Sequence, residues 1–520
     1  MALPARVIDV GITDGEVSLH LTEQGEVGRR FTLSWCWGGP TTLPPKLQKT
    51  DTSTQKPALY IKKSKGESLL LEQGNRIPFD ILPPVFQDAI HLTRKLGEKY
   101  LWIDSLCIIQ NCKQDWVEQA ALMGDIYRDS ILCISANAAS NCQEGIFYPS
   151  QKLRDQVLES YKVQIPYFNS NYPKIEGTIY PLRMALKDAL HVSDPLGERA
   201  WTFQESALSP RELIWTNLEV KWHCRTARFS EKYPSCEIAS KKSKANFKRD
   251  LAQNQSPSID PRELWRRVVQ SFSFRSITYS TDIFPAIGGI AREIQMLSKG
   301  GLGAYYAGLW EKGMYEGLLW SMTSLKPDDF ADDRRNYVAP SWSWASTIPS
   351  GERNFFPRVR YPPIQRWKAF KVSASILDIK MGYYVDNKNN DSFGLVASGK
   401  IRITAPHLKL GSTTEIGETR MQVSISAEDC EPLGRIICFK ILSNTIIEPK
   451  VNFSLLQVKE MALKGEEPGR DKLVTKTEKH DAWCLILQKT DKEDEYVRIG
   501  LCIMDDGLTE GWGLIEVNII

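Results

Sequence analysis

The stretch LWIDSLCIIQNCKQDWVEQAALMGDIYRDSILCISA, residues 101–136, indicates the fold class of this chain. It opens as an apolar strand, passes through a polar loop into an amphipathic helix, and closes on a second apolar run. Strand, helix and strand at this spacing are typical of a parallel sheet with crossover helices. We therefore predict an α/β domain around this stretch.

One carboxylate, Asp104, lies inside the first apolar run. A buried carboxylate is costly unless it is hydrogen-bonded or used in a site. Parallel sheets place their sites at the carboxyl ends of the strands, so Asp104 points to a site there. The alternative is a carboxylate that accepts hydrogen bonds from backbone N–H groups and fixes a neighbouring loop.

Apolar runs on either side extend the predicted domain. We expect strands at residues 31–36, 100–108 and 131–135, and a helix that starts at Pro83–Pro84 and ends before Gly97. Residues 40–74 are expected to form a long surface loop, and the basic run KKSKANFKR at 241–249 a solvated loop. Beyond about residue 365, short strands separated by polar turns predict a β-rich segment.

Composition argues against several classes of protein. The chain has 520 residues, 66 of them basic and 63 acidic, so its net charge of +3 does not favour nucleic acid or an anionic membrane as a partner. No apolar run is long enough for a membrane span, and the N-terminus lacks a signal-peptide pattern. The eleven cysteines include no CxxC pair. We therefore expect a soluble, cytoplasmic protein without disulfides.

Two further clusters belong to the predicted site. Ser34, Trp35, Cys36, Trp37 and Gly38 follow one strand, where the glycine pair 38–39 lets the backbone approach a ligand and its N–H groups bind an anion. The alternative for this cluster is a tight turn beside two packed tryptophans.

The second cluster contains Trp201 and Glu205, which are four residues apart and share a helix face. A ring beside a carboxylate suits a ligand that carries a ribose, because the ring stacks and the carboxylate accepts hydrogen bonds from sugar hydroxyls. The alternative is a salt bridge between Glu205 and a nearby arginine such as Arg211.

Other chemistry has weaker support. Cys107, His91 and Asp104 are the residue types of a thiol hydrolase, but a thiol in an apolar strand is usually inert. His223 and Cys224 lack partners at metal-ligand spacing, so no metal site is predicted. Neither a phosphate-binding glycine loop nor a G-x-S-x-G motif occurs.

Three blocks resemble the fungal heterokaryon-incompatibility (HET) domain. They are FTLSWCWGG from residue 31, the whole of residues 82–136, and RAWTFQESALSPREL from residue 199. The family's blocks run in the same order, as an L-S-Y-C-W-G strand, an L-W-I-D-S-L-C-I-I-Q strand with a D-W helix, and an R-x-W-T-x-Q-E helix. The resemblance covers residues 31–206. Trp35 replaces the usual Tyr, and Ser206 stands where Arg is common.

The resemblance implies a role in fungal non-self recognition and regulated cell death, with a fold similar to Toll/interleukin-1 receptor (TIR) domains. Some TIR domains cleave NAD at the nicotinamide–ribose bond with one glutamate, and Trp201 to Glu205 looks like the W-C-x-x-E-L of plant TIR domains. The resemblance implies that Glu205 is the catalytic residue and that Asp104, Trp201 and residues 34–38 contact the ligand. NAD would be the substrate, and no cofactor is implied.

The expected architecture is a TIR- or flavodoxin-like, mainly parallel sheet flanked by helices. This HET domain would span residues 1–225, with a mostly helical extension at 226–350 and a β-rich C-terminal domain at 351–520. Three hypotheses of function stay open at this point. The protein is an enzyme that cleaves NAD, a non-enzymatic module that signals by self-association or by binding an unidentified protein partner, or a protein that keeps the domain for an unrelated intracellular role.

Overall fold

The computed structural model divides the chain into two compact units, residues 1–253 and 254–520, and each is described by itself. The three-domain division stays a prediction. The structure describes these residues: 1–50, 59–62, 68–71, 75–147, 165–168, 176–179, 194–217, 219–231, 247–252, 259–323, 337–347, 358–361, 374–383, 392–416, 420–425, 434–441, 453–455, 481–492, 494–505 and 514–520.

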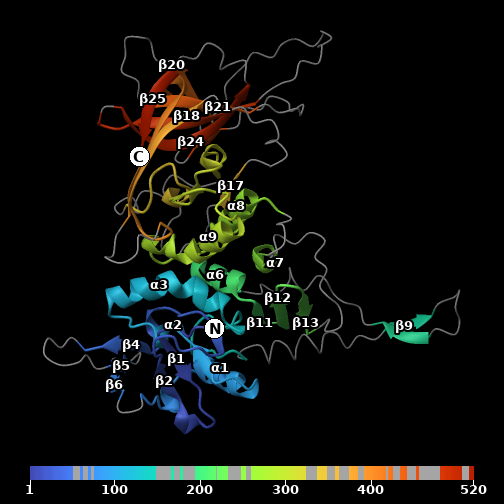
Figure 1. Ribbon diagram of the computed structural model, residues 1–520. Helices are drawn as coiled ribbons and strands as arrows, with labels where there is room; N and C mark the ends of the chain where they lie inside the picture. Colours follow the sequence, from blue (N-terminus) through green and yellow to red (C-terminus); the bar gives the residue numbers. More distant parts are fainter. Residues whose placement is uncertain are drawn as a thin grey trace. The chain divides into compact units, whose positions relative to one another are not determined.

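The first unit is an α/β structure built on an eight-stranded sheet (Figure 1). The sheet order is β13-β12-β11-β8-β3-β7-β1-β2. Its strands are β1 (Arg6–Asp9), β2 (Ser18–Leu21), β3 (Arg30–Ser34), β7 (Tyr100–Trp102), β8 (Leu132–Ser135), β11 (Arg211–Trp215), β12 (Val220–Cys224) and β13 (Arg228–Ser230). The pairs β11–β8, β8–β3 and β3–β7 are parallel, whereas the pairs at both edges are antiparallel. The sheet is therefore parallel at its centre only.

The order of the parallel strands defines where a ligand would lie. Counted along the chain, β3 comes first, then β7, β8 and β11, so their spatial order is 2-1-3-4. This is the order of flavodoxin-like sheets, in which the crevice lies outside the carboxyl ends of the first and third strands. In this chain those strands are β3 and β8, and their last paired residues are Ser34 and Ser135.

Helices cover the parallel strands. They are α1 (Pro84–Lys95), α2 (Asp104–Cys107), α3 (Lys113–Arg128), α6 (Ala200–Leu208) and α7 (Phe247–Ala252). Helices α3 and α6 pack together and α6 contacts β3, whereas α1 contacts β7. In Figure 1, α3 and α6 lie side by side on one side of this unit and α1 lies on the other. The core between them contains Phe31, Leu33, Phe86, Ile90, Trp102, Ile126, Tyr127 and Ile134.

The predicted strand at residues 100–108 is wrong beyond Trp102. The chain turns at that point into α2, whose first residue is Asp104. The Asp104 carboxylate accepts a hydrogen bond from the Ser105 N–H (2.8 Å), and the Ile108 N–H bonds the Asp104 carbonyl oxygen (3.0 Å). With the Cys107 N–H also donating to the Ile103 carbonyl oxygen (2.8 Å), these backbone bonds form a single helical turn in place of a continued strand. The predicted strand at 31–36 likewise ends earlier, at Ser34.

The predicted surface loop at residues 40–74 contains a small antiparallel sheet. Its strands are β4 (Lys46–Lys49), β5 (Leu59–Lys62) and β6 (Ser68–Leu70). The side chains of Leu47 and Ile61 are buried in the core of the unit, so the loop interpretation is wrong for the described residues. Farther along the chain, β9 (Ile165–Phe168) and β10 (Glu176–Ile179) form a separate pair.

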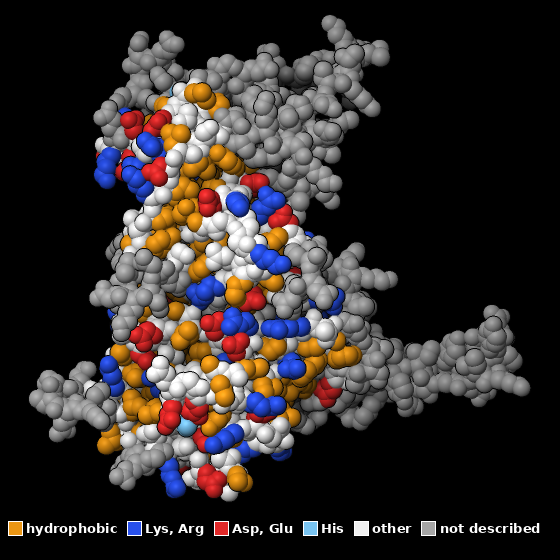
Figure 2. Space-filling view, viewed as in Figure 1, with side chains coloured by type: hydrophobic (Ala, Val, Ile, Leu, Met, Phe, Trp, Pro, Cys, Tyr) orange, Lys and Arg blue, Asp and Glu red, His pale blue; other side chains and the backbone are white. Residues whose placement is uncertain are grey.

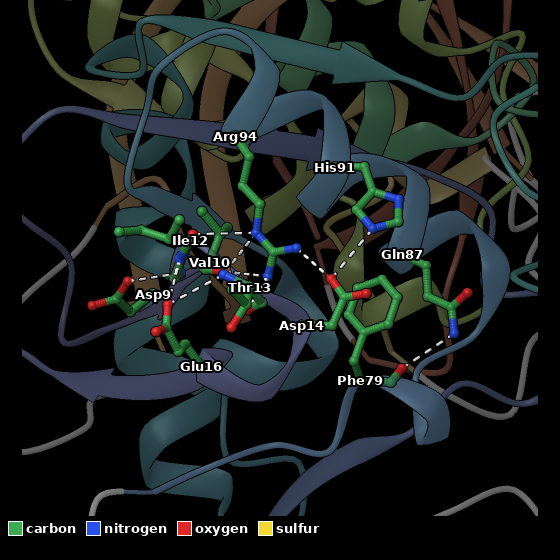
Figure 3. Close-up of polar contacts among 11 residues, drawn as sticks. Asp9, Val10, Ile12, Thr13, Asp14, Glu16, Phe79, Gln87, His91 and Arg94 are labelled. Carbon is green, nitrogen blue, oxygen red and sulfur yellow. Dashed lines mark hydrogen bonds and ion pairs between the residues drawn. The ribbon is translucent and has the colours of Figure 1, made fainter.

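The loop after β1 is fastened to α1 by Arg94 (Figure 3). Its guanidinium donates to the carbonyl oxygens of Val10 (2.8 Å) and Thr13 (2.8 Å) and to the Asp14 carboxylate (2.5 Å). The hydrogen bond to Asp14 is the main reason that the pKa of Asp14 is lowered. The Nε2 atom of His91 contacts the same carboxylate (3.4 Å). This cluster fixes an antiparallel edge of the sheet.

The second unit combines helices with a further sheet. Its helices are α8 (Pro261–Phe272), α9 (Pro285–Leu297) and α10 (Met314–Leu318), with the short pairs β14 (Tyr305–Tyr306) and β15 (Leu309–Trp310), and β16 (Ser321–Thr323) and β17 (Arg358–Arg360). The eight strands of the sheet are β18 (Ser375–Tyr383), β19 (Val396–Ile416), β20 (Arg420–Ile425), β21 (Gly434–Ile441), β22 (Phe453–Leu455), β23 (Asp481–Lys489), β24 (Glu495–Asp505) and β25 (Leu514–Ile519).

Charged side chains of both signs are interspersed on the face that Figure 2 shows. Among the helices in the described ranges, none is both long enough and apolar enough to cross a membrane.

Candidate functional site

Asp104 holds the two tryptophans that follow β3. The Trp35 indole N–H donates to Asp104 Oδ1 (2.9 Å), and the Trp37 indole N–H donates to Asp104 Oδ2 (2.6 Å). The two rings stack with centroids 6.0 Å apart and an interplanar angle of 13°. Since its two oxygens accept both indole N–H groups and the Ser105 N–H, this carboxylate organises the turn after β3.

Glu205 reaches the carboxyl end of β3 from α6. The Ser34 hydroxyl donates a hydrogen bond to Glu205 Oε2. The Tyr127 hydroxyl, which donates to the Leu33 carbonyl oxygen (2.9 Å), is a further hydrogen-bonding neighbour of Glu205. The other end of α6 is fixed as well, because the Ser209 hydroxyl donates to the Glu205 carbonyl oxygen (2.7 Å). Residues from three segments of the chain thus meet at Glu205.

Burial gives Glu205 an unusual electrostatic state. Only 7% of the residue is exposed, and desolvation raises the pKa of Glu205 to about 7. The hydrogen bond from Ser34 acts in the opposite direction and lowers the pKa. The neighbouring charge of Asp104 raises it further, whereas Arg199 lowers it. Burial also raises the pKa of Asp104, opposed by the two indole N–H groups and the Ser105 N–H. A carboxyl with a pKa near 7 changes its charge at neutral pH, which is the property that acid–base and electrostatic catalysts share.

Three other predicted site residues lie in different surroundings. Cys36 is buried, and its thiol interacts with Arg199. Gly38 has a φ of +81°, and a Cβ there would lie 2.3 Å from Thr42 Oγ1, so this turn requires glycine for its own packing. Trp201 packs edge-on against Trp116 of α3 (6.5 Å, 87°).

Arg199 and Tyr127 are site residues that the sequence analysis did not select. Arg199 precedes α6 as its N-cap and acts on Cys36, Asp104 and Glu205 together. Arg199 is the first residue of the R-x-W-T-x-Q-E block, and this position could have identified it from the sequence. Tyr127 gave no such signal, because its helical spacing is explained by the core alone. The proposed pair of Glu205 with Arg211 does not occur, since the Arg211 guanidinium donates to the Ile131 carbonyl oxygen (3.3 Å).

The thiol-hydrolase arrangement is not assembled. Burial raises the pKa of the Cys107 thiol to about 12, which makes a thiolate nucleophile unfavourable at neutral pH. The His91 ring contacts Asp14 and Phe79 instead of Cys107. The described cysteine side chains are all free thiols: Cys36, Cys107, Cys112, Cys133, Cys142, Cys224 and Cys484. In the described part of the chain, no group of three or more His, Cys, Asp and Glu side chains is arranged to hold a metal ion.

Comparison with known protein families gives one match, over the part of the chain that carries Asp104 and Glu205. Residues 31–205 match the family model of the heterokaryon incompatibility protein (HET). The chain carries a HET domain. This supports a heterokaryon incompatibility-type function. No curated protein and no solved structure gives a significant match to the chain.

The matched stretch contains Asp104 with its two tryptophans, and Glu205 with Ser34, Tyr127 and Arg199. The match begins at Phe31 in β3 and ends at Glu205 itself. It also spans the small sheet β4–β5–β6.

A second buried cluster lies directly beyond the HET match. The Glu212 carboxylate pairs with Lys248 of α7 (3.1 Å) and accepts hydrogen bonds from Ser135 (2.8 Å) and Ser206 (2.9 Å). Lys248 also donates to the carbonyl oxygens of Ser206 and Ser209 at the end of α6. The pKa of Glu212 is lowered despite burial, chiefly by Lys248. The Glu212 carboxyl therefore favours its ionised form at neutral pH, in contrast to Glu205.

This cluster corrects the interpretation of the basic run at 241–249. Lys248 lies in a helix, and its side chain is 6% exposed, so it is no part of a solvated loop. Residues 241–246 of the run lie outside the described residues.

Proposed function

We propose that this protein acts in fungal non-self recognition and regulated cell death, and that its HET domain cleaves the nicotinamide–ribose bond of NAD at Glu205. The observation that carries the proposal is the buried Glu205 carboxyl, with a pKa of about 7, at the carboxyl end of β3. Open α/β sheets bind ligands at this edge, where the strand order reverses. The 2-1-3-4 order of the parallel strands supports the TIR- or flavodoxin-like arrangement on which the comparison with NAD-cleaving TIR domains rests.

In the proposed reaction, the bond between the ribose C1′ and the nicotinamide nitrogen breaks heterolytically. The bonding pair leaves with the nitrogen, which releases neutral nicotinamide and leaves a ribosyl oxocarbenium-like centre. The Glu205 carboxylate stabilises this positive charge, which develops only near the transition state. Water then adds to C1′ and transfers a proton to Glu205, giving ADP-ribose. The proton is released to solvent when the carboxyl ionises again.

The surrounding residues have separate roles in this proposal. Ser34 orients one Glu205 oxygen by donating to it, and Arg199 favours the ionised form of the carboxyl. Asp104 is occupied by the two indoles, so its role is to fix the turn at residues 34–38 and not to react. A cytoplasmic location is part of the proposal, and the free thiols of the described cysteines are consistent with it.

Expression of the full chain in a filamentous fungus tests this function. We expect the wild type to kill cells while cellular NAD falls, and Glu205→Gln to do neither at equal protein level. The control is Glu198→Gln, which changes an exposed glutamate seven residues upstream and should behave as the wild type. If Glu205→Gln still kills with NAD unchanged, the non-enzymatic interaction module takes the place of the enzyme.

A further inference from the structure

One lysine of the small sheet, Lys46, lies beside the turn that carries Trp35 and Trp37, here called the tryptophan turn. Lys46 of β4 and Lys62 of β5 are directly opposite each other in the antiparallel register. The Lys46 ammonium lies over the Trp37 ring, 5.0 Å from its centroid. The strand is held in place, because the Gln110 N–H donates to the Leu47 carbonyl oxygen (2.8 Å) and α2 packs against β4. Lys46 is thereby fixed next to the cluster that Asp104 organises.

The charges of this lysine pair are poorly compensated. Like charges directly opposite each other on neighbouring strands are destabilising. Within the described residues, neither Lys46 nor Lys62 forms an ion pair with a carboxylate at 4.0 Å or less. Desolvation and the charge of Lys62 lower the pKa of Lys46, and the distant pull of Asp104 only partly offsets them. An anion between the two ammonium groups would relieve this repulsion.

We propose that Lys46 and Lys62 form the phosphate-binding part of the HET site and that they receive the pyrophosphate group of a dinucleotide. This inference rests on the proposed function, because it assigns the anionic half of the same substrate. Ammonium groups bind phosphate oxygens through charge-assisted hydrogen bonds. The pyrophosphate would lie on the Trp37 side of the site, and the ribose that reacts would face Glu205.

The proposal gives a role to the two lysines of this small sheet. Leu47 and Ile61 attach the small sheet to the core through their apolar side chains. Their neighbours in sequence, Lys46 and Lys62, place two cations opposite each other, and Lys46 also lies over the Trp37 ring. A binding role explains why a cationic pair is presented at this edge of the domain.

Calorimetric binding of ADP-ribose and of inorganic pyrophosphate to the full chain tests the subsite without requiring cleavage. The variants are Lys46→Gln, Lys62→Gln and the double variant. A hydrogen bond to a charged group is typically lost at a cost of about tenfold in affinity, so each single variant should bind ADP-ribose about tenfold more weakly. Wild-type binding should also weaken as salt rises, because phosphate contacts are electrostatic.

The matched control is Lys99→Gln. Lys99 also lies over an aromatic ring, Tyr100, at 5.0 Å, but it is paired with Asp9 (3.3 Å). This variant removes an equivalent cation–π contact and should bind ADP-ribose as the wild type does. If Lys46→Gln fails to fold, Lys62→Gln carries the test, because Lys62 is exposed.

The outcomes separate the subsite from the proposed reaction. Lysine-dependent binding without any release of nicotinamide from NAD would keep the subsite and reject the cleavage. Unchanged binding in both lysine variants, or no binding of either probe by the wild type, would overturn the subsite, whether or not NAD is cleaved.

Discussion

Ser34 and Ser135 lie directly opposite each other on the parallel strands β3 and β8, and each donates a hydrogen bond to a different buried glutamate. Ser34 bonds Glu205, whose pKa is raised to about 7, and Ser135 bonds Glu212, whose pKa is lowered. The two glutamates differ because Lys248 pairs with Glu212, whereas Glu205 has the like charge of Asp104 nearby. The same kind of serine–glutamate hydrogen bond is therefore made to a carboxyl with a raised pKa in one case and to a carboxyl with a lowered pKa in the other.

Replacing Ser34 with alanine should raise the pKa of Glu205 further. The hydroxyl stabilises the ionised form, and a hydrogen bond to a charged group corresponds to about one pKa unit or more. We expect the pH dependence of nicotinamide release to move upward by about one pH unit. Ser135→Ala, at the matching position of β8, should leave that dependence in place. Equal profiles for wild type and Ser34→Ala would contradict this role of Ser34.

Glu205→Gln should alter how stability depends on pH. A carboxyl with a folded-state pKa of about 7 and an unfolded-state value near 4.5 favours folding at low pH. That contribution is complete below about pH 4.5 and is lost as the pH rises through 7. The variant lacks it, so its stability relative to the wild type should increase by about 3 kcal/mol between those pH values. Urea unfolding at several pH values measures this, and a constant difference would mean that Glu205 is not perturbed.

Asp104→Asn should loosen the tryptophan turn. An asparagine offers one acceptor oxygen where the carboxylate accepts both indole N–H groups, so one buried donor is left unpaired. We expect a loss of about 1–3 kcal/mol in the free energy of unfolding, with a change in tryptophan fluorescence. Asp125→Asn on the exposed face of α3 is the control and should cost much less. Unchanged stability and fluorescence in Asp104→Asn would argue against this structural role.

Lys248→Met should destabilise the first unit strongly. It leaves the buried Glu212 charge without its cation, and breaking a buried pair in this way typically costs about 3–5 kcal/mol. Adding Glu212→Gln removes the unpaired charge and should restore part of the loss. Denaturant unfolding of the two variants decides this, and a double variant no more stable than Lys248→Met would show that the pair is not the cause.

The sequence predicted the convergence at the sheet edge for a clear physical reason. Parallel strands end at the same edge, so residues just after two such strands can approach each other, as Trp35 and Trp37 approach Asp104. The length of β7 was not predictable from hydrophobicity, because an apolar run fits a buried helix as well as a strand. The backbone hydrogen bonds from Cys107 to Ile103 and from Ile108 to Asp104 show that the run becomes helical.

Contacts between residues that are far apart in the sequence could not be predicted from local sequence patterns. Lys248 lies 36 residues after Glu212 in the sequence, within a basic run whose composition is typical of a solvated loop. It nevertheless forms a buried ion pair with Glu212. The small sheet was missed because its strands are short and rich in lysine, with apolar anchors only at isolated positions such as Leu47 and Ile61.

Release of nicotinamide from NAD by the purified full chain, measured from pH 5 to 9, tests the central claim most directly. The account predicts that the wild type releases nicotinamide with an activity that rises through an inflection near pH 7, as Glu205 ionises. Glu205→Gln should lower the rate about a hundredfold or more, whereas Glu198→Gln should match the wild type. No release by the wild type, or full activity in a correctly folded Glu205→Gln variant, would contradict the claim that Glu205 cleaves NAD.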